Sequence, residues 1–314
     1  METIVYNIDS RNRDKTLYPL ETEFTYDLDD NIKNISSIEL SSAEFGNTSY
    51  VFSSAKDNNY YKLKLSTDTD YKTITIPDGN YKSSEIITQL NTLTKEEFAT
   101  GIEFSLNTNT GKTTITCTNS FDIDFSNTGT TNYKKFSEIL GFSRDITTFT
   151  IAGSSTESLK KVSTNIMNVI GEHYYLLKIN DLGHVYHKNK RYFSKIIINA
   201  PKYEVVYETR NRYVSKKVEF KQPTNIRRLE IQLLDTFGNT IDTNGINHFS
   251  FSLEFKVIRN ETLKRYKMNP HYSKEVQKAV LYDKMLEYFN KKLGNNNTNG
   301  IQVTYLKLLK NDYN

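Results

Sequence analysis

Alternation of apolar and polar residues is the dominant pattern along this chain. The clearest case is HFSFSLEFKV at residues 248–257, where every second residue is a phenylalanine, a leucine or a valine. A period of two over this length predicts a long β-strand with one face buried. Since the other face carries serine, glutamate and lysine, the pattern favours an antiparallel sheet with a solvated face over a parallel one.

Shorter runs of the same kind recur before this strand. They predict strands at residues 22–28 (TEFTYDL), 36–40 (SSIEL), 60–65 (YYKLKL), 71–76 (YKTITI), 192–199 (YFSKIIIN), 216–220 (KKVEF) and 227–233 (RRLEIQL). Polar turns separate them, and NTNTGK at residues 107–112 is typical of a hairpin turn. The small number of helices between the strands argues against a doubly wound α/β fold.

Two early segments show the spacing of helices. Isoleucine and leucine recur at helical spacing within residues 83–98, where Ser83 is the expected N-terminal cap. A shorter helix is expected over residues 132–140, with Gly141 in the position that follows a helix end.

The C-terminal part of the chain differs from the rest in pattern and charge. Residues 273–293 carry an apolar stripe at steps of three and four, which predicts a helix, and residues 301–309 predict a short strand. From Lys256 to Asn314 there are twelve basic and five acidic residues, a local charge of +7 within a total of +4, so the remainder carries −3. Such a basic tail suits nucleic acid, an anionic membrane face or an acidic protein, and equally a solvated helix face.

The order of the predicted elements suggests one domain interrupted by another. Between residues 60 and 152 the order is strand, strand, helix, strand, hairpin, strand and short helix, which is a small α+β unit. It lies between an opening block of strands and a closing block that ends near residue 258. The sequence therefore predicts an insertion within one all-β domain.

The composition limits the classes of protein to which this chain could belong. The chain has 314 residues, 37% of them hydrophobic, and a single cysteine, Cys117, in the alternating run TTITCT. That thiol is expected to be buried, and a chain that cannot form an internal disulfide fits a reducing compartment. No apolar run of the sequence predicts a signal peptide or a membrane span.

Motifs that would indicate nucleotide or metal binding are weak. TGKTT at residues 110–114 lacks the earlier glycine of a phosphate-binding loop, since that position is Leu106. His173, His184 and His187 have no cysteine or acidic cluster near them, which favours incidental loop histidines over a metal site.

Two further features have competing interpretations. Asp122 and Asp124 share one face of a predicted strand, but no histidine or lysine base accompanies them, and the sequence has no G-x-S-x-G elbow. The basic, aromatic run YETRNRYVSKK at residues 207–217 suits a phosphate backbone or, as its flanking alternation favours, a hairpin with outward charges. The chain is therefore predicted not to be an enzyme and to hold no cofactor and no metal.

The opening stretch and the order of later motifs resemble one group of proteins. IVYNIDSRNRD resembles the start of penton and minor capsid proteins of large DNA viruses (giant viruses) and virophages, which begin with a strand and an arginine-bearing turn. Further stretches resemble the same group in the same order: NIKNISSIELSSAEF (31–45), IPDGNYKSSEIITQLN (76–91), FSEILGF (136–142), residues 173–198 and residues 226–255. The resemblance covers residues 1–258 and leaves the basic C-terminal helix outside it.

This resemblance implies a mainly β fold, with a single jelly-roll β-sandwich, an inserted small α+β domain and a C-terminal helix. The expected parts are the first part of the jelly roll at 1–59, the insertion at 60–152, the second part of the jelly roll at 153–258, and a basic helix and tail at 259–314.

The resemblance also implies a structural virion protein, the penton, which forms a pentameric plug at icosahedral capsid vertices. Such a homopentamer would be assembled in the host cytoplasm and would contact the major capsid protein and other minor capsid proteins, with its basic tail near genome or inner membrane. Asp9, Arg11, Arg13 and Asp14 are expected at a subunit interface, where the arginines offer planar donors to acidic groups. Local capping of the turn is the alternative role for these residues.

An enzyme on a β-sandwich stays an alternative for which only His173, His184 and His187 are candidate residues. Two other functions, neither of them enzymatic, also stay open. One is a minor or cement capsid protein beneath the outer shell, which would not form pentamers. The other is a glycan-binding or receptor-binding jelly-roll module that uses insertion loops such as residues 126–132.

Overall fold

The computed structural model describes residues 2–65, 67–98, 101–126, 133–144, 148–151, 159–209, 216–245 and 248–258. Within these residues the fold is mainly β, and its strands pair in antiparallel fashion. The predicted helix at 273–293, the predicted strand at 301–309 and nearly all of the loop 126–132 lie outside the described residues.

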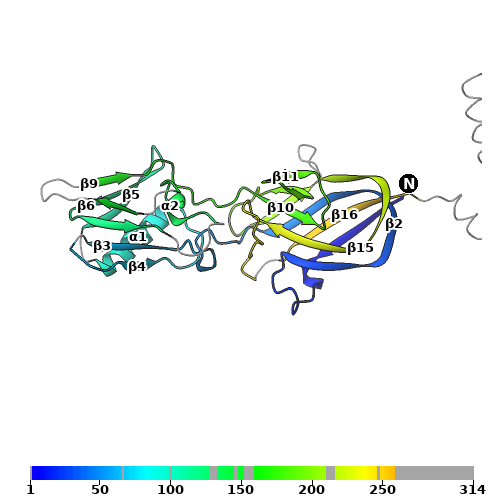
Figure 1. The fold of residues 1–314 in the computed structure, drawn as a ribbon, viewed down its shortest axis with the longest axis horizontal. Helices are drawn as coiled ribbons and strands as arrows, with labels where there is room; N and C mark the ends of the chain where they lie inside the picture. The colour runs from blue at the N-terminus through cyan, green and yellow to red at the C-terminus, as the bar shows by residue number, and fades with distance from the viewer. Residues whose placement is uncertain are drawn as a thin grey trace, which may run out of the picture. The chain divides into compact units, whose positions relative to one another are not determined.

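One curled sheet makes the larger part of the fold. Its strands follow the order β1–β16–β2–β15–β10–β13, and β14 also pairs with β2 (Figure 1). Their bounds are β1 Glu2–Asp9, β2 Glu23–Gly46, β10 Tyr174–Ile179, β13 Ser194–Ile197, β14 Val205–Thr209, β15 Lys217–Leu234 and β16 Ser250–Val257.

The two longest strands divide this sheet into two layers. The second half of β2, residues 35–46, pairs with β16 on one side and with β14 and the start of β15 on the other. The first half of β2 pairs with residues 226–232 of β15, which pair in turn with β10. The first layer is therefore β1–β16–β2–β14, with the start of β15 continuing β14, and the second is β2–β15–β10–β13. This is the double-layer arrangement of a jelly roll, and the predicted fold class is confirmed.

Each long strand bends where it passes from one layer to the other. Asn34 of β2 has a left-handed φ of 58° at this corner, and β15 shows register shifts between Glu219 and Arg228. Figure 1 shows both strands curving round the same end of the sandwich. The separate strands predicted at 22–28 and 36–40 are one strand, and those predicted at 216–220 and 227–233 are another, because long-range pairing carries the backbone through each corner.

The core of the jelly roll fills the space between the two layers. Side chains that alternate along β16 point inward, as its pattern predicts, and they meet residues of β2, β10, β13 and β15. The fully buried members include Ile8, Phe45, Phe193, Leu229, Phe249, Phe251 and Phe255. Burying aromatic side chains of this size contributes about 2–3 kcal/mol each, before the entropy of folding is counted.

A second hydrophobic core is built from the residues between β2 and β10. It draws on a four-stranded sheet, β4–β3–β7–β8, a three-stranded sheet, β5–β6–β9, and two helices. The bounds are β3 Tyr60–Leu65, β4 Lys72–Thr75, α1 Ser83–Glu97, β5 Ile102–Asn107, β6 Lys112–Cys117, β7 Phe121–Asp124, α2 Phe136–Ile139, β8 Thr148–Ile151 and β9 Leu159–Val162. Tyr61 and Phe136 stack at its centre, with ring centroids 5.4 Å apart.

The predicted insertion boundaries at 60 and 152 stay a prediction. Members of the second core extend from Val51 to Val169, and β9 pairs with β6. Cys117, predicted to be buried, is 2% exposed within this core.

The residues that flank the two helices show which positions act as caps. Helix α1 begins at Ser83, but Lys82 occupies the cap position, and its backbone N–H donates to the Glu85 carboxylate at 2.8 Å. The prediction that Ser83 is the cap is therefore wrong by one residue, because the acidic residue two positions after Ser83 closes the turn. Gly141 follows α2 with a φ of 89°, as predicted.

The segment 207–217 is not the predicted hairpin. β14 and the start of β15 run in the same direction along β2, so they form one interrupted strand, with residues 210–215 outside the described range. Glu208 and Lys216 do not point outward, since they form a buried ion pair between the ends of these two strands.

Smaller elements complete the fold. The short helical turn η1 Ser10–Asn12 and the hairpin of β11 Val185–His187 with β12 Lys190–Tyr192 belong to the jelly-roll part. The turn η2 Ser54–Lys56 follows the first residues of the second core. Tyr192 from that hairpin packs on Leu176 and Leu234, on the outer face of the second layer. Among the described helices, none is both long enough and apolar enough to cross a bilayer.

Candidate assembly surface

The turn that follows β1 begins with a local cap. The Asp9 carboxylate accepts a hydrogen bond from the backbone N–H of Arg11 at 2.8 Å and bonds from the Arg11 guanidinium at 2.8 and 3.0 Å. These bonds hold the pKa of the Asp9 carboxyl below its ordinary value, mainly through the side-chain bond from Arg11. The charged residues after β1 therefore end this strand and form the cap of η1.

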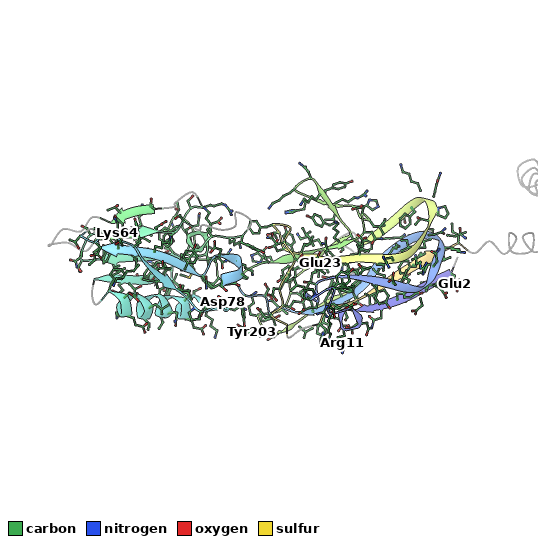
Figure 2. The ribbon with its side chains drawn as sticks, turned by 60° about the horizontal axis from the view of Figure 1, so that its bottom comes forward. Glu2, Arg11, Glu23, Lys64, Asp78 and Tyr203 are labelled. Atoms are coloured by element: carbon green, nitrogen blue, oxygen red, sulfur yellow. The ribbon has the colours of Figure 1, made fainter. Side chains whose placement is uncertain are left out.

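Arg11 is the exposed member of this turn. Its side chain is 63% exposed and lies at the surface of the jelly-roll part (Figure 2). The hydrogen bond and the charge of Asp9 raise the pKa of the Arg11 guanidinium, and the nearby Glu44 on β2 adds to that effect. Arg11 thus presents a fixed positive charge to solvent, with free donors beyond those used by Asp9.

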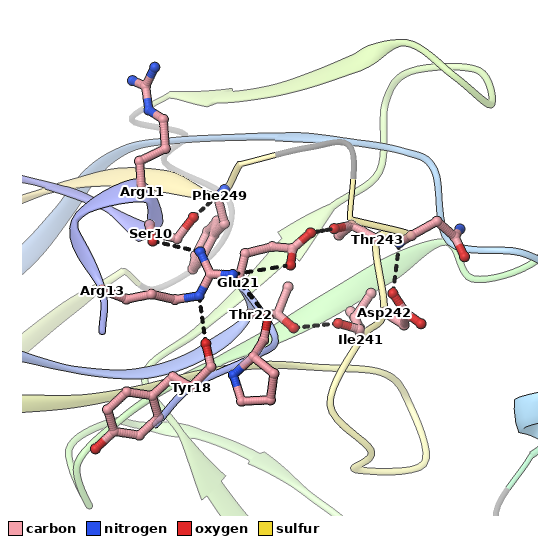
Figure 3. Close-up of polar contacts among 12 residues, drawn as sticks. Ser10, Arg11, Arg13, Tyr18, Glu21, Thr22, Ile241, Asp242, Thr243 and Phe249 are labelled. Atoms are coloured by element: carbon pink, nitrogen blue, oxygen red, sulfur yellow. Dashed lines mark hydrogen bonds and ion pairs between the residues drawn. The ribbon is translucent and has the colours of Figure 1, made fainter. Parts of the chain in front are cut away.

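Arg13 points the other way, into the protein (Figure 3). Its guanidinium donates to the carbonyl oxygens of Ser10, Tyr18 and Pro19 at 2.8, 2.8 and 2.9 Å. It also forms an ion pair with Glu21 at 3.7 Å, and both side chains are 7% exposed. Arg13 therefore holds the loop between β1 and β2 in one conformation.

Asp14 acts within the same loop. Its carboxylate accepts from the backbone N–H groups of Thr16 and Leu17 at 2.9 and 3.2 Å, which is a local turn motif. The structure thus brings the four predicted residues, Asp9, Arg11, Arg13 and Asp14, into one turn and gives each a contact inside the chain. Their role at a subunit interface stays a prediction, and Arg11 is the one with an accessible charged group.

The turn adjoins the outer face of the first layer. Asp9 is paired with Ser250, Ser250 with Glu44, and Glu44 with Tyr207, so these four side chains follow one row across β1, β16, β2 and β14. Figure 1 shows β16 lying between the N-terminal strand and β2.

This outer face combines exposed apolar side chains with charges. Val205 is 45% exposed and Tyr207 63%, and Tyr207 is paired with Glu44, whose charge acts on Arg11. We call these four residues the outer-face patch. Sequence reasoning missed Glu44, Val205 and Tyr207, because alternation along a strand does not show which exposed positions come together across strands. The available signal was the apolar residues at the outward positions of β14.

Two of the other side chains singled out in the sequence, His187 and Asp122, have partners within the chain. The ring of His187 is bonded to the carbonyl oxygen of Thr236 at 2.8 Å, and Asp122 lies 3.6 Å from Lys64 across the β3–β7 pair. TGKTT forms the turn and start of the β5–β6 hairpin, with Gly111 at a φ of 67°. Within the described ranges, no group of three histidine, cysteine or acidic residues is arranged to hold a metal ion.

Comparison with known proteins places these features in a family. No curated protein matches this sequence. The solved structure of a selenomethionine-labelled mavirus penton protein aligns with 82% of this chain and 100% of its own, at 12% identity and a TM-score of 0.43. A family model described as a family of unknown function, DUF5901, matches residues 1–227. Since this match covers well over half of the 314 residues, the chain belongs to the DUF5901 family.

Proposed function

We propose that this protein is a structural capsid protein, and specifically the penton that forms a pentameric plug at icosahedral vertices. The observation that carries the proposal is the first layer of the jelly roll, which ends in two unlike strands. Among the described strands, β1 pairs only with β16, and β14 pairs only with β2. The order of sequence motifs from residue 1 to residue 258 supports the same role.

Two unlike edges on one layer suit a ring of identical subunits. In a closed ring each contact is heterologous, so one patch of a subunit meets a different patch of the next copy. The β1 edge and the β14 edge lie on opposite sides of the first layer and offer two such patches. Pairing of another strand with β14 is restricted, because the Asn199 side chain already donates to the carbonyl oxygen of Tyr207 at 3.1 Å. We therefore expect side chains to dominate the contact.

The outer-face patch supplies the chemistry of that contact. Arg11 and Glu44 have opposite charges, and both are exposed, so a neighbouring copy can complement each of them. Val205 and Tyr207 add apolar surface beside these charges, in the combination of aromatic and arginine side chains that is enriched at interfaces. The proposed occupant of the patch is a second copy of this chain.

The proposal extends to partners and location. The pentamer would sit in the virion, meet the major capsid protein and other minor capsid proteins, and be assembled in the host cytoplasm. The basic segment from Lys256 onward would contact genome or inner membrane, through its local charge of +7.

Purified particles provide the test of the capsid role, and native mass spectrometry tests the pentamer. We expect the chain in the particles, density for it at fivefold vertices, and a discrete pentamer across a protein concentration series. Absence of the chain from particles would overturn the capsid role. Its presence beneath the shell without fivefold density would refute the penton and favour the cement protein. Glycan binding by a monomer that is absent from particles would favour the receptor-binding module.

A further inference from the structure

A cavity lined in part by lysine and acidic side chains lies where the loops at one end of the jelly roll meet the segments that lead into and out of the second core. Its volume is about 90 Å³. A single water needs about 10–15 Å³ of such space, so this cavity has room for a small polyatomic ligand. Lys56 comes from the η2 turn after β2, Lys134 from the segment before α2, and Lys202 from the loop before β14.

The lysine side chains converge on the same stretches of backbone. The Lys56 ammonium donates to the Ser49 hydroxyl at 3.2 Å and to the carbonyl oxygen of Tyr50, while Lys202 donates to the carbonyl oxygen of Ser49 at 2.9 Å. Lys134 donates to the carbonyl oxygen of Gly171 at 3.5 Å. A methyl group at Gly171 would lie 3.3 Å from the Lys202 nitrogen, so this glycine, with a φ of 86°, leaves the room that the ammonium occupies.

Acidic residues also line the cavity, and each of them accepts at least one hydrogen bond from a donor other than the lysines. Asp235 accepts from the backbone N–H groups of Phe237 and Asn239 at 2.8 and 2.9 Å. Glu172 accepts from the Thr236 hydroxyl at 2.7 Å, and Asp242 accepts from the backbone N–H of Asn244 at 2.7 Å.

The three lysines and the three carboxylates of the lining are equal in number but are not directly paired. Across the described part of the chain, no carboxylate lies within 4 Å of the ammonium nitrogen of Lys56, Lys134 or Lys202. Burial lowers the pKa of Lys56, even though Asp235, Glu172 and Asp242 act in the opposite sense. Burial and the charge of Lys56 lower the pKa of Lys202 to about 8. Buried charges in proteins are normally paired, so these ammonium groups have capacity for a further acceptor.

We propose that this cavity binds a small oxyanion of the phosphate or sulfate class, held by the ammonium groups of Lys56, Lys134 and Lys202. Tetrahedral oxygens suit donors that approach from three separate segments of the chain, since each oxygen can accept from a different lysine. Binding would tie the end of η2, the segment before α2 and the loop before β14 to one ligand. This site is independent of the proposed capsid role.

Calorimetric titration of the full chain with sodium sulfate and with inorganic phosphate tests the site, against sodium chloride at equal ionic strength. We expect saturable binding of both oxyanions and none of chloride. Lys202→Met and Lys134→Gln should each weaken sulfate binding by about tenfold or more, the scale of a hydrogen bond to a charged group. Lys33→Gln, which changes an exposed lysine on β2 outside the cavity, is the matched control and should bind as the unmodified chain does.

The pH dependence gives an independent readout. Sulfate does not change its charge above neutral pH, so a fall in its affinity between about pH 7 and pH 9.5 would report deprotonation within the cavity, where the pKa of Lys202 is lowered to about 8. The other titratable groups that line the cavity are the following: Lys56, Lys134, Glu172, Asp235, Asp242, Tyr50, Tyr133 and Tyr175.

The opposite results would overturn the site. They are a lack of saturable sulfate and phosphate binding by the unmodified chain, or equal binding by all variants. If Lys202→Met does not fold, the Lys134→Gln result decides. An acetate arm separates the two kinds of oxyanion, because tight acetate binding would point to a carboxylate ligand in place of a tetrahedral one.

Discussion

Arg13 and Glu21 lie 3.7 Å apart, with 7% of each side chain exposed. The hydroxyl of Thr243 also donates to the Glu21 carboxylate, so the pair links the loop after β1 to the loop before β16 (Figure 3). The Ser10 N–H donates to the carbonyl oxygen of Phe249 at 2.9 Å and adds a second link between these loops. An arginine that looks like a surface charge in the sequence is thus part of the interior.

Replacing Arg13 with alanine should destabilise the fold. The change removes three hydrogen bonds to carbonyl oxygens and leaves Glu21 without its cationic partner, so we expect a loss of about 3 kcal/mol in the free energy of unfolding, measured by urea denaturation. Arg13→Lys keeps the charge but cannot reach all three carbonyls, and should lie in between. An Arg13→Ala protein as stable as the unmodified chain would contradict this account.

Replacing Arg11 with alanine should affect assembly more than folding. Arg11 is exposed and its pair with Asp9 is at the surface, so the stability change should be about 1 kcal/mol or less. In native mass spectrometry we expect the proposed pentamer to form only at higher protein concentration. Asn12→Ala, at the neighbouring exposed position, is the control and should leave assembly unchanged. An unchanged pentamer in Arg11→Ala would remove Arg11 from the proposed interface.

Gly141→Ala should destabilise the second core. Gly141 has a φ of 89°, and a methyl group there would lie 2.4 Å from the carbonyl oxygen of Asn165. Strain and clash together should cost about 2–3 kcal/mol, seen as faster hydrogen exchange in α2 and β6. Gly245→Ala is the matched control, since Gly245 also has a positive φ but no atom within 4 Å of the added methyl group, and should cost about 1 kcal/mol.

Lowering the pH should remove the stabilisation that the Asp9 carboxylate gives to the turn after β1. Arg11 lowers the pKa of Asp9 in the folded protein, so the stabilisation is present above the unfolded value of about 3.9 and is lost as the pH falls through the folded value. Asp9→Asn should therefore be less stable than the unmodified chain near neutral pH, with the difference narrowing in strong acid. Chemical denaturation at a series of pH values measures this, and a constant difference down to about pH 2 would exclude the cap as its source.

The alternation of apolar and polar residues predicts strands and buried positions correctly wherever burial alternates strictly. Phe249 to Val257 are buried in the order that the pattern predicts, because β16 has one face on the core throughout. The alternation fails to predict the strands where they bend from one layer of the jelly roll to the other. Residues 29–34, DDNIKN, look like a turn, yet β2 continues through them, since β15 pairs with Ile32 and both β15 and β16 pair with Ile35.

Side-chain roles at the candidate site were predictable only where they are local. Capping by Asp9 could be inferred, because its partner Arg11 is two residues away. The burial of Arg13 could not, since it depends on Glu21 and on a loop more than two hundred residues later in the sequence. The burial of the Glu208–Lys216 ion pair could not be predicted either. In the sequence, two charged residues that pair in the interior look the same as two that are exposed to solvent.

The pairing of Glu2 with Val257 determines how the jelly roll would respond to mechanical load. Because β1 and β16 are antiparallel neighbours, the chain enters and leaves this part of the fold at the same end. A pull applied between these two points would load the hydrogen bonds of the pair one after another, as in opening a zipper, and not all together as in shear. Tension between residue 2 and the segment beyond residue 258 would therefore peel β1 from β16 before it disturbs the long strands that join the two layers.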